Sequence, residues 1–313
     1  TRLSGMFSTH PATSIMVCPA QQRREALLQL AAVHQPAQQA ALQQALVKAS
    51  TRPEGWSGLW VACQAGRVCA AAWVECQENR IAQLWLPKQN NQFVEPLLSQ
   101  LHRWVATQEL VLCHVALDKT MASWEASLLN LGMQRLATLD HLAWHCRPVA
   151  HVRGLPPLRP FDELTPAQQQ ALVEQVGEGS LDCPALRDVL PAQALLEGFY
   201  HQASSASEHW YYLQGEQGRH AGLLLDASPG REHWSVQLMG LVPGWRGQGQ
   251  GKALVQQAQA MVAQAGASQL ALTVDRDNLP AQRAYRQAGM LPAGEHQLLG
   301  WCVLPATELN CRP

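Results

Sequence analysis

The sequence predicts an α/β protein built from two copies of one unit. Three observations lead to this prediction. Short apolar stretches typical of strands alternate with helical stretches, their order is the same before and after the middle of the chain, and a proline-rich segment separates the two series. The length of 313 residues also suggests about two domains.

The elements of each half follow from apolar periodicity and from the glycines and prolines that end them. The first half predicts a helix over 23–48 interrupted at Pro36, strands over 58–76 and 81–86, a helix over 94–108, a strand over 110–117, a helix over 121–130 and a strand reaching 146. The second half predicts helical sequence over 165–202, strands over 210–226 and 233–242, a helix from 249, a strand over 269–274, a helix over 279–288 and a strand over 297–304. Three prolines and a glycine in 151–160 predict a linker.

A true internal repeat keeps a nearly constant offset between matching positions. Four identical pairs are separated by 157 residues: Asp118 and Asp275, Gly132 and Gly289, Met133 and Met290, and Trp144 and Trp301. The pair formed by Leu86-Pro87 and Val242-Pro243 follows at an offset of 156. The shared offset and the shared order of elements favour two copies of one unit.

The composition is that of a globular protein with little net charge. Hydrophobic residues make up 47% of the chain, charged residues 15%, and the formal net charge is −1. No basic field indicates nucleic-acid binding, and no stretch approaches the ~20 apolar residues of a membrane span. Residues 1–18 lack the features of a signal peptide. We expect no nucleic-acid partner, no membrane partner and a cytoplasmic location.

The cysteines and histidines favour a protein without a metal. Nine cysteines, an odd number, form no C-x-x-C pair, so reduced thiols are the simplest interpretation. His141, His145, Cys146 and His151 leave a zinc site as an alternative, because the first two would share one face of a strand. No second ligand pair stands at zinc-finger spacing, so ordinary strand residues are the favoured interpretation.

A glycine-rich loop joins a strand to a helix in the second half. Arg246-Gly-Gln-Gly249-Gln-Gly251 precedes a helix, which directs free backbone N–H groups and the positive end of the helix dipole at an anion. Ala253 stands where a Walker loop has its hydroxyl, and neither glycine register fits G-x-G-x-x-G. The loop therefore predicts a phosphate compound other than ATP or a dinucleotide, with a glycine turn that binds nothing as the alternative.

Two motifs carry a resemblance to a known family. Arg246-x-x-Gly249-x-Gly251, preceded by LVP, resembles the acyl-CoA pyrophosphate loop of the GNAT (general-control-related N-acetyltransferase) superfamily. The segment LTVDRDNLPAQRAYRQAGM, with Asn278 and Tyr285, is similar to the second signature of that superfamily. The resemblance covers about 165–304.

The resemblance implies a tandem member of this superfamily. The fold class would be α/β, more strictly α+β, with two GNAT-like units that each have a mixed, mostly antiparallel sheet flanked by helices. Residues 1–150 would form a degenerate GNAT-like domain and 151–313 a catalytic GNAT domain. The implied enzyme is an N-acetyltransferase that uses acetyl-CoA as cosubstrate and acetylates a primary amine by direct attack. The amine would belong to a small molecule or a peptide N-terminus.

The resemblance also implies roles for particular residues. The pantetheine arm of the cofactor would pair with the strand before the loop, and the pyrophosphate would contact the loop amides. The implied cofactor-binding residues are Met239, Gly240, Leu241, Arg246, Gly247, Gln248, Gly249, Gln250, Gly251, Lys252 and Asn278. Tyr285 would be the catalytic acid that protonates the CoA thiolate. As alternatives, Asn278 caps a helix and Tyr285 is a core residue.

The resemblance does not identify a general base. Members that acetylate the N-terminal alanine of ribosomal proteins place a Glu five residues before the Asn, where this chain has Thr273. Other members use an acidic or histidine side chain at the start of the strand that precedes the loop, where Glu232 and His233 stand here; Asp275 is a third candidate. His233 has the most suitable unperturbed pKa.

The first half lacks the corresponding machinery. Residues 90–95 stand opposite the loop and contain no glycine, Met121 stands opposite Asn278, and Leu128 stands opposite Tyr285. We expect that the first domain has lost this form of acyl-CoA binding and either has a structural role or walls the substrate cleft. The alternative to an enzyme is a non-catalytic acyl-CoA-binding or protein-interaction module with the same fold.

Overall fold

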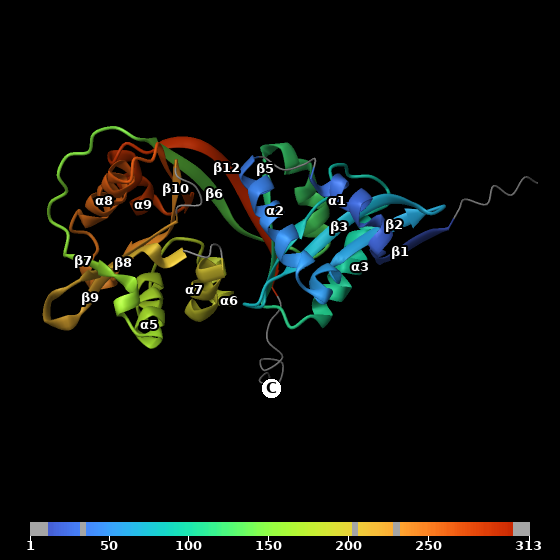
Figure 1. The fold of residues 1–313 in the computed structure, drawn as a ribbon, viewed down its shortest axis with the longest axis horizontal. Coiled ribbons are helices and arrows are strands. Elements are labelled where there is room, and N and C mark those ends of the chain that lie inside the picture. The colour runs from blue at the N-terminus through green and yellow to red at the C-terminus, as the bar shows by residue number, and fades with distance from the viewer. Residues whose placement is uncertain (1–11, 32–35, 202–205, 228–231, 303–313) are drawn as a thin grey trace, which may run out of the picture. The chain divides into compact units, whose positions relative to one another are not determined.

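The computed structural model describes residues 12–31, 36–201, 206–227 and 232–302 (Figure 1). They fall into two compact units. Unit 1 takes the described residues of 1–115, 121–134 and 300–313, and unit 2 takes those of 116–120 and 135–299. Each unit has a mixed, mostly antiparallel sheet flanked by helices, so the predicted fold class is confirmed.

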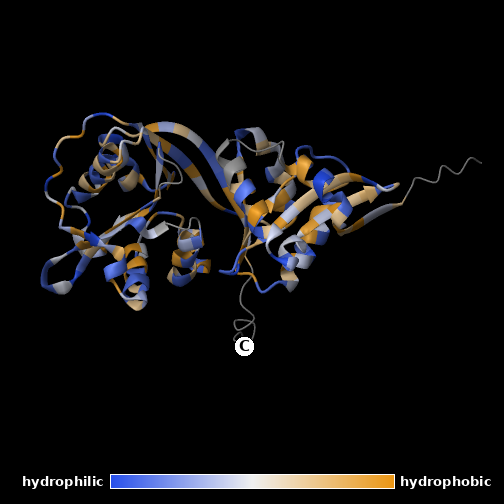
Figure 2. Ribbon diagram, in the orientation of Figure 1, coloured by the Kyte–Doolittle hydropathy of each residue, from blue (hydrophilic) through white to orange (hydrophobic). Residues whose placement is uncertain are grey.

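Unit 1 contains five strands that are neighbours in chain order, β1-β2-β3-β4-β5. These are β1 (Thr13–Val17), β2 (Leu59–Gln64), β3 (Arg67–Cys76), β4 (Ile81–Trp85) and β5 (Leu112–Asp118), of which the last three residues of β5 count with unit 2. The helices are α1 (Arg23–Ala31), α2 (Pro36–Ser50), α3 (Val94–Thr107) and α4 (Glu125–Asn130). The core packs around Trp73 and Trp85, and Figure 2 shows hydrophobic residues concentrated along β3.

Unit 2 has a sheet of order β12-β6-β11-β10-β9-β8-β7. Its strands are β6 (Gln134–His145), β7 (Leu158–Pro160), β8 (His209–Gln214), β9 (His220–Ala227), β10 (His233–Leu241), β11 (Gln269–Asp275) and β12 (Leu291–Cys302). Its helices are α5 (Pro166–Gly177), α6 (Pro184–Val189), α7 (Ala192–His201), α8 (Gln250–Gln264) and α9 (Leu279–Gln287). The predicted linker contains β7, an edge strand, which is a position that tolerates Pro160. The last strand, β12, begins six residues before the predicted start at 297. The last two residues of the predicted strand, 303 and 304, lie outside the described ranges.

The two halves repeat one topology. In the first half β2-β3-β4 are antiparallel neighbours and β4 pairs in parallel with β5. In the second half β8-β9-β10 are antiparallel neighbours and β10 pairs in parallel with β11. Gly132 and Gly289, which match at the repeat offset, both end a helix with positive φ, at 89° and 81°. The structure therefore supports the predicted repeat.

The last strand of each half contributes residues to the unit built mainly from the other half: β6 does so from Arg135 onward, and β12 does so with Gly300 to Cys302. β6 comes from the first half, but it pairs antiparallel with β11, and its Trp144 lies in the core of unit 2. β12 ends in unit 1, where the ring of Trp301 stacks on His102 with centroids 4.6 Å apart and its Nε1 donates to the carbonyl oxygen of Leu131 at 3.0 Å. The repeat in the sequence does not reveal this exchange. The assignment of 1–150 as degenerate and 151–313 as catalytic stays a prediction.

Two helical layers cover the sheet of unit 2. Figure 1 shows α8 and α9 on one side of the strands and α5 to α7 on the other. Leu254, Val255 and Val274 belong to the core under α8 and α9, whereas Leu172 and Trp210 belong to the core under α5 and α7. The first turn of α5 is closed by a capping box between Thr165 and Gln168, which fixes where this helix begins.

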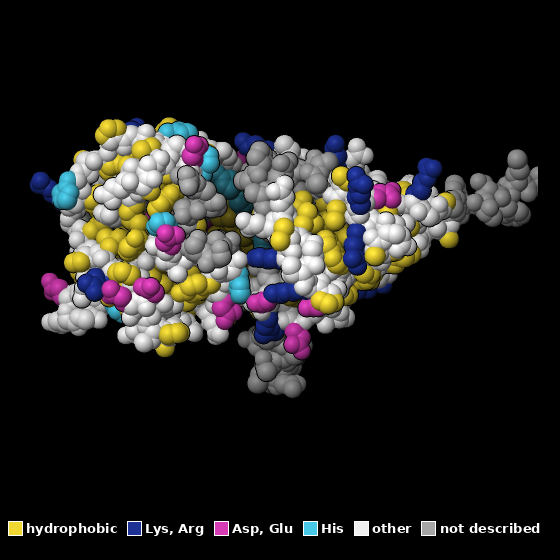
Figure 3. All heavy atoms as spheres, viewed as in Figure 1, with side chains coloured by type: hydrophobic (Ala, Val, Ile, Leu, Met, Phe, Trp, Pro, Cys, Tyr) yellow, Lys and Arg dark blue, Asp and Glu magenta, His cyan; other side chains and the backbone are white. Residues whose placement is uncertain are grey.

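Three further features concern the surface charge, the helices and the cysteines. Both acidic and basic side chains occur on the face shown in Figure 3, and neither sign forms a continuous field there. Within the described residues, every helix is too short or too polar to cross a bilayer. The eight described cysteines are free thiols.

Asp226 is a buried carboxylate in the middle of unit 2. It lies on β9 opposite Val236 of β10 and His209 of β8, and it is 0% exposed. Neither carboxyl oxygen has a hydrogen-bond partner in the described structure. Burial without a partner disfavours the charged form and raises the pKa of Asp226 to about 8.

We expect Asp226→Asn to stabilise the protein at alkaline pH. Unfolded Asp releases its proton near pH ~3.9, whereas folded Asp226 holds it to about pH 8, so the wild-type free energy of unfolding falls as pH rises between these values. The substitution removes this loss. Its stabilisation relative to wild type should be larger above about pH 8 than below pH ~4, by up to roughly 5 kcal/mol.

Urea unfolding below pH ~4 and above the Asp226 pKa of about 8 measures this difference. Asp188→Asn, at an exposed position on α6, is the matched control and should show no such pH dependence. If Asp226→Asn changed the free energy of unfolding equally at both pH values, the raised pKa of this carboxyl would be contradicted.

Candidate functional site

β10 and β11 diverge after a short stretch of pairing. Their parallel register covers only His233 to Ser235 against Gln269 to Ala271. Beyond it, β10 stays paired with β9 and β11 stays paired with β6. A β-bulge between Val236 and Leu238 accompanies the divergence, as expected for a feature that increases strand twist. The result is a wedge between two strands whose facing edges offer backbone N–H and C=O groups to a ligand.

The glycine-rich loop follows directly from the end of β10. Gly247 and Gly249 have positive φ values of 78° and 77°, a conformation that disfavours other residues, and both are exposed. Gly249 is the N-cap of α8 and has no side chain to bond the first free N–H groups of the helix. These amides and the exposed Lys252 side chain are therefore available to an anion.

Arg246 fastens this loop to the end of α5. Its Nε donates to the carbonyl oxygen of Leu241 at 2.9 Å, and its two terminal nitrogens donate to the carbonyl oxygens of Val176 at 2.9 Å and Glu178 at 2.7 Å. The guanidinium thus satisfies carbonyl groups at a helix C-terminus, where a cation is also favoured by the helix dipole. Its side chain is thus engaged within the protein and clamps the loop to the end of α5.

The strand residues next to the loop are held close to α5. A Cβ atom added at Gly240 would lie 2.5 Å from Cγ1 of Val176, so this position accepts only glycine without a rearrangement. Gly240 pairs with Leu223 of β9, and Leu241 pairs with Gly222. Met239 and Gly240 are half-buried. The edge of β10 that faces away from β9 lines the wedge.

Asp182 and Asn278 meet near the end of β11. Asp182 Oδ1 accepts from the backbone N–H of Asp275 at 2.9 Å, and its carboxyl is also bonded to the Asn278 side chain. Asn278 Oδ1 accepts from the N–H of Ala281 at 3.3 Å and caps α9. The structure therefore confirms that Asn278 caps a helix, which is one of the two roles that the sequence suggests for it.

Tyr285 lies in the core under α8 and α9 and is 9% exposed. Burial is the main cause that raises its pKa, and the nearby charge of Asp182 adds to the effect. Its hydroxyl therefore keeps its proton throughout the physiological pH range. Burial also raises the pKa of Asp182 itself.

The three candidate bases are placed differently relative to the wedge. Glu232 and His233 lie at the closed end, where β10 still pairs with β11, and His233 is roughly 26 Å along the strand from Leu241. Asp275 is buried, and its two carboxyl oxygens accept from the N–H groups of Cys183 at 3.0 Å and Asp277 at 2.9 Å. Each oxygen of Asp275 is thus already used to hold the backbone.

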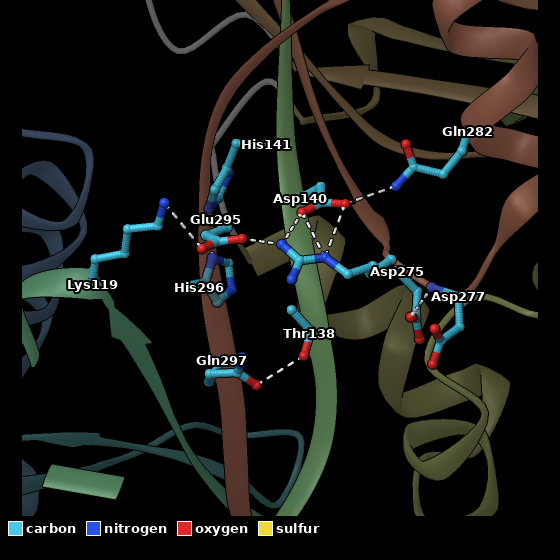
Figure 4. Close-up of polar contacts among 11 residues, drawn as sticks. Lys119, Thr138, Asp140, His141, Asp275, Asp277, Gln282, Glu295, His296 and Gln297 are labelled. Carbon is cyan, nitrogen blue, oxygen red and sulfur yellow. Dashed lines mark hydrogen bonds and ion pairs between the residues drawn. The ribbon is translucent and has the colours of Figure 1, made fainter. Parts of the chain in front are cut away.

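A polar network lies along β6, β11 and β12 (Figure 4). Asp140 of β6 accepts from Arg276 at 2.6 Å and from Gln282 at 2.9 Å, and Arg276 also pairs with Glu295 of β12. The bond from Arg276 is the main cause that holds the pKa of Asp140 below its usual value. Lys119 pairs with Glu295 at 3.2 Å. These contacts hold β12 to β6 and to the end of β11.

His141 stands beside this network, and the sequence suggests for it only the alternative of a zinc ligand. It lies opposite Thr273 of β11, and His145 lies opposite Gln269, so the two histidines share a face as expected. His141 contacts Thr273 and His296. Across the described residues, no three His, Cys, Asp or Glu side chains are grouped to hold a metal ion. The pairing of His141 with Thr273 depends on the strand exchange, which has no signal in the sequence.

Comparisons with known proteins agree with this geometry. Residues 182–290 match the model of the acetyltransferase (GNAT) family. Among curated protein sequences, none matches the chain. Among solved structures, a GCN5-related N-acetyltransferase from Sphaerobacter thermophilus is similar with a TM-score of 0.62 and 16% identity, over 94% of this chain and 96% of that one.

Two further structures share the fold. A tandem GNAT protein from the clavulanic acid biosynthesis pathway has a TM-score of 0.54 and 13% identity, over 94% of this chain and 100% of that one. A GCN5-related N-acetyltransferase from Kribbella flavida has a TM-score of 0.51 and 16% identity, over 77% and 91%. Residues 182–290 therefore match the GNAT acetyltransferase family, and the chain has the fold of solved GNAT proteins.

Proposed function

We propose that unit 2 transfers an acetyl group from acetyl-CoA to a primary amine of a small molecule or a peptide N-terminus. The observation that carries this proposal is the wedge between β10 and β11, which opens next to a glycine-rich helix N-terminus. The family match of residues 182–290 supports acyltransferase chemistry in general. The acetyl donor, the amine acceptor and the location of the site in unit 2 are the proposal.

The loop and the strand would bind the two ends of the donor. The amides of Gly247 to Lys252 would hold the pyrophosphate, with Gln248 and Gln250 contributing backbone N–H groups and Arg246 keeping the loop in place. The free edge of β10 at Met239, Gly240 and Leu241 would pair with the amides of the pantetheine arm, as an added strand does. Asn278 would border the same wedge through its place at the start of α9.

The chemical step would require no covalent enzyme intermediate. A neutral amine attacks the thioester carbonyl, and a backbone N–H of β10 near Leu241 stabilises the oxygen as it gains charge. When the C–S bond breaks, Tyr285 donates its hydroxyl proton to the leaving sulfur. A positioned acid of this kind typically contributes ~10²–10⁴-fold to the rate.

The matching loop of the first half has no glycine and is fastened by a side chain. Asn91 Oδ1 accepts from the N–H of Phe93 at 2.9 Å, and its Nδ2 donates to the carbonyl oxygen of Cys69 at 3.0 Å. These contacts tie residues 90–95 down just before α3. They support the proposal that the first domain no longer binds acyl-CoA in this way. The competing function is a module that binds acyl-CoA without catalysis, and the two predictions below separate binding from turnover.

We expect Gly249→Glu to weaken acetyl-CoA binding at least ~10-fold. The substitution forces a side chain into a positive-φ position and places a carboxylate where the loop would hold pyrophosphate. Gly266→Glu carries the same backbone strain at the other end of α8, with φ of 71°, and Gly244→Glu adds the same charge nearby at a position without strain. Isothermal titration calorimetry with acetyl-CoA should find at most small effects in these two controls. Equal losses in all three variants would contradict the loop assignment.

We expect Tyr285→Phe to lower kcat by at least ~10²-fold and to leave acetyl-CoA affinity unchanged. Phenylalanine keeps the buried ring but has no proton to donate. CoA release across a panel of amines measures turnover, and calorimetry measures binding. Tyr212→Phe, at another buried tyrosine of unit 2, is the matched control. Unchanged turnover in Tyr285→Phe would remove the acid role, and binding without turnover in wild type on every amine would favour the non-catalytic module.

A further inference from the structure

An amine that reaches the wedge as an ammonium ion must lose a proton before it can attack. Glu232 and His233 lie at the closed end of the wedge, and both carboxyl oxygens of Asp275 hold backbone N–H groups. The proposed function therefore lacks a proton acceptor among the residues that the sequence suggested.

Thr273 is the exposed residue of β11 beside the wedge. Its neighbours Leu272 and Val274 point into the core that contains Tyr285. Because side chains alternate along a strand, Thr273 points to the opposite face, the one covered by α5 to α7. An amine that approaches the thioester from this face would meet the Thr273 hydroxyl, while the leaving sulfur would face Tyr285.

His141 stands directly behind this hydroxyl. It is the cross-strand partner of Thr273, and its Nδ1 lies 3.2 Å from Thr273 Oγ1. Its Nε2 is hydrogen-bonded to Nδ1 of His296 on β12, and the two rings have centroids 4.6 Å apart. The three side chains form a continuous chain of hydrogen bonds that leads away from the wedge.

We propose that Thr273 and His141 form a proton relay that accepts the proton of the attacking ammonium. His141 begins neutral, with its proton on Nε2 donated to His296 and its Nδ1 lone pair accepting from the Thr273 hydroxyl. As the N–H bond of the ammonium breaks, Thr273 Oγ1 takes that proton and passes its own to Nδ1. The amine becomes neutral, Thr273 is restored, and His141 carries the added charge. This inference rests on the proposed function of the site.

The surroundings of His141 keep it in the state that the relay needs. Burial lowers the pKa of His141, and the charge of Asp140 on the same strand acts in the opposite direction. Asp140 and Glu295 of β12 are both paired with Arg276, and Lys119 also pairs with Glu295, so the nearby charges largely balance. The ring is therefore neutral at pH 7 and able to accept a proton.

Replacing His141 tests the relay directly. We expect His141→Gln to lower kcat/KM at pH 7 by ~10²-fold for an amine that the wild type accepts, with unchanged acetyl-CoA affinity. In wild type the acid limb of the pH–rate profile should fall below the ordinary imidazole pKa of ~6.5. In the variant this limb should move to higher pH, because without the relay only the fraction of the amine that is already neutral in solution can react.

The strand offers a matched control and the relay a second probe. His145→Gln makes the same change four residues along the same face of β6, at the closed end of the wedge, and should keep wild-type activity. Thr273→Ser should retain most activity, whereas Thr273→Val should repeat the loss and the displaced acid limb. Imidazole NMR in Thr273→Val should also show a changed His141 pKa, which reports the hydrogen bond without turnover.

The outcomes separate this inference from the proposed function. Turnover in His141→Gln with an unchanged rate and acid limb overturns the relay and leaves the transferase intact. Turnover in Thr273→Val equal to that in Thr273→Ser overturns the part played by the hydroxyl. Failure of wild type to release CoA with any amine overturns the proposed function and the relay together.

Discussion

The candidate site depends on two parallel strands that part after three paired residues. Separating β10 from β11 leaves backbone groups without the partners that a sheet would supply, which is costly unless each strand is secured on its other side. β10 is secured by its register with β9 as far as Leu241, and β11 by its register with β6 over its full length. Arg246 adds three hydrogen bonds at the mouth of the opening. The wedge is thus a property of the sheet that surrounds it.

The exchange of terminal strands gives the first half a part in this site even though its own loop is tied down. β6 comes before the linker in the sequence, but it supports β11 along seven residues and places His141 opposite Thr273. The first half is therefore more than a spacer in this interpretation. It supplies the outer support of the strand that lines the wedge, and the side chain that stands behind the exposed hydroxyl of that strand.

The sequence predicts the local features of this molecule well and the distant contacts poorly. Apolar periodicity and glycine placement locate α8, α9 and the loop, and the constant offset reveals the repeat. The Thr165 cap and the Asn278 cap also follow from local rules. His141 and Thr273, by contrast, are 132 residues apart, and only the exchanged pairing of β6 with β11 brings them together. The bonds of Arg246 to Val176 and Glu178 have no local signal in the sequence either, because they join a loop to a helix of another layer.

The exchanged strands also bear on how the chain can fold during synthesis. Trp301, which closes unit 1 against His102 and Leu131, is among the last described residues of the chain to be made. Most of unit 1 is therefore made first, but the unit cannot be completed until Trp301 has been translated. Until then the surface of unit 1 that Trp301 contacts stays uncovered, and incompletely packed units of this kind are prone to aggregate.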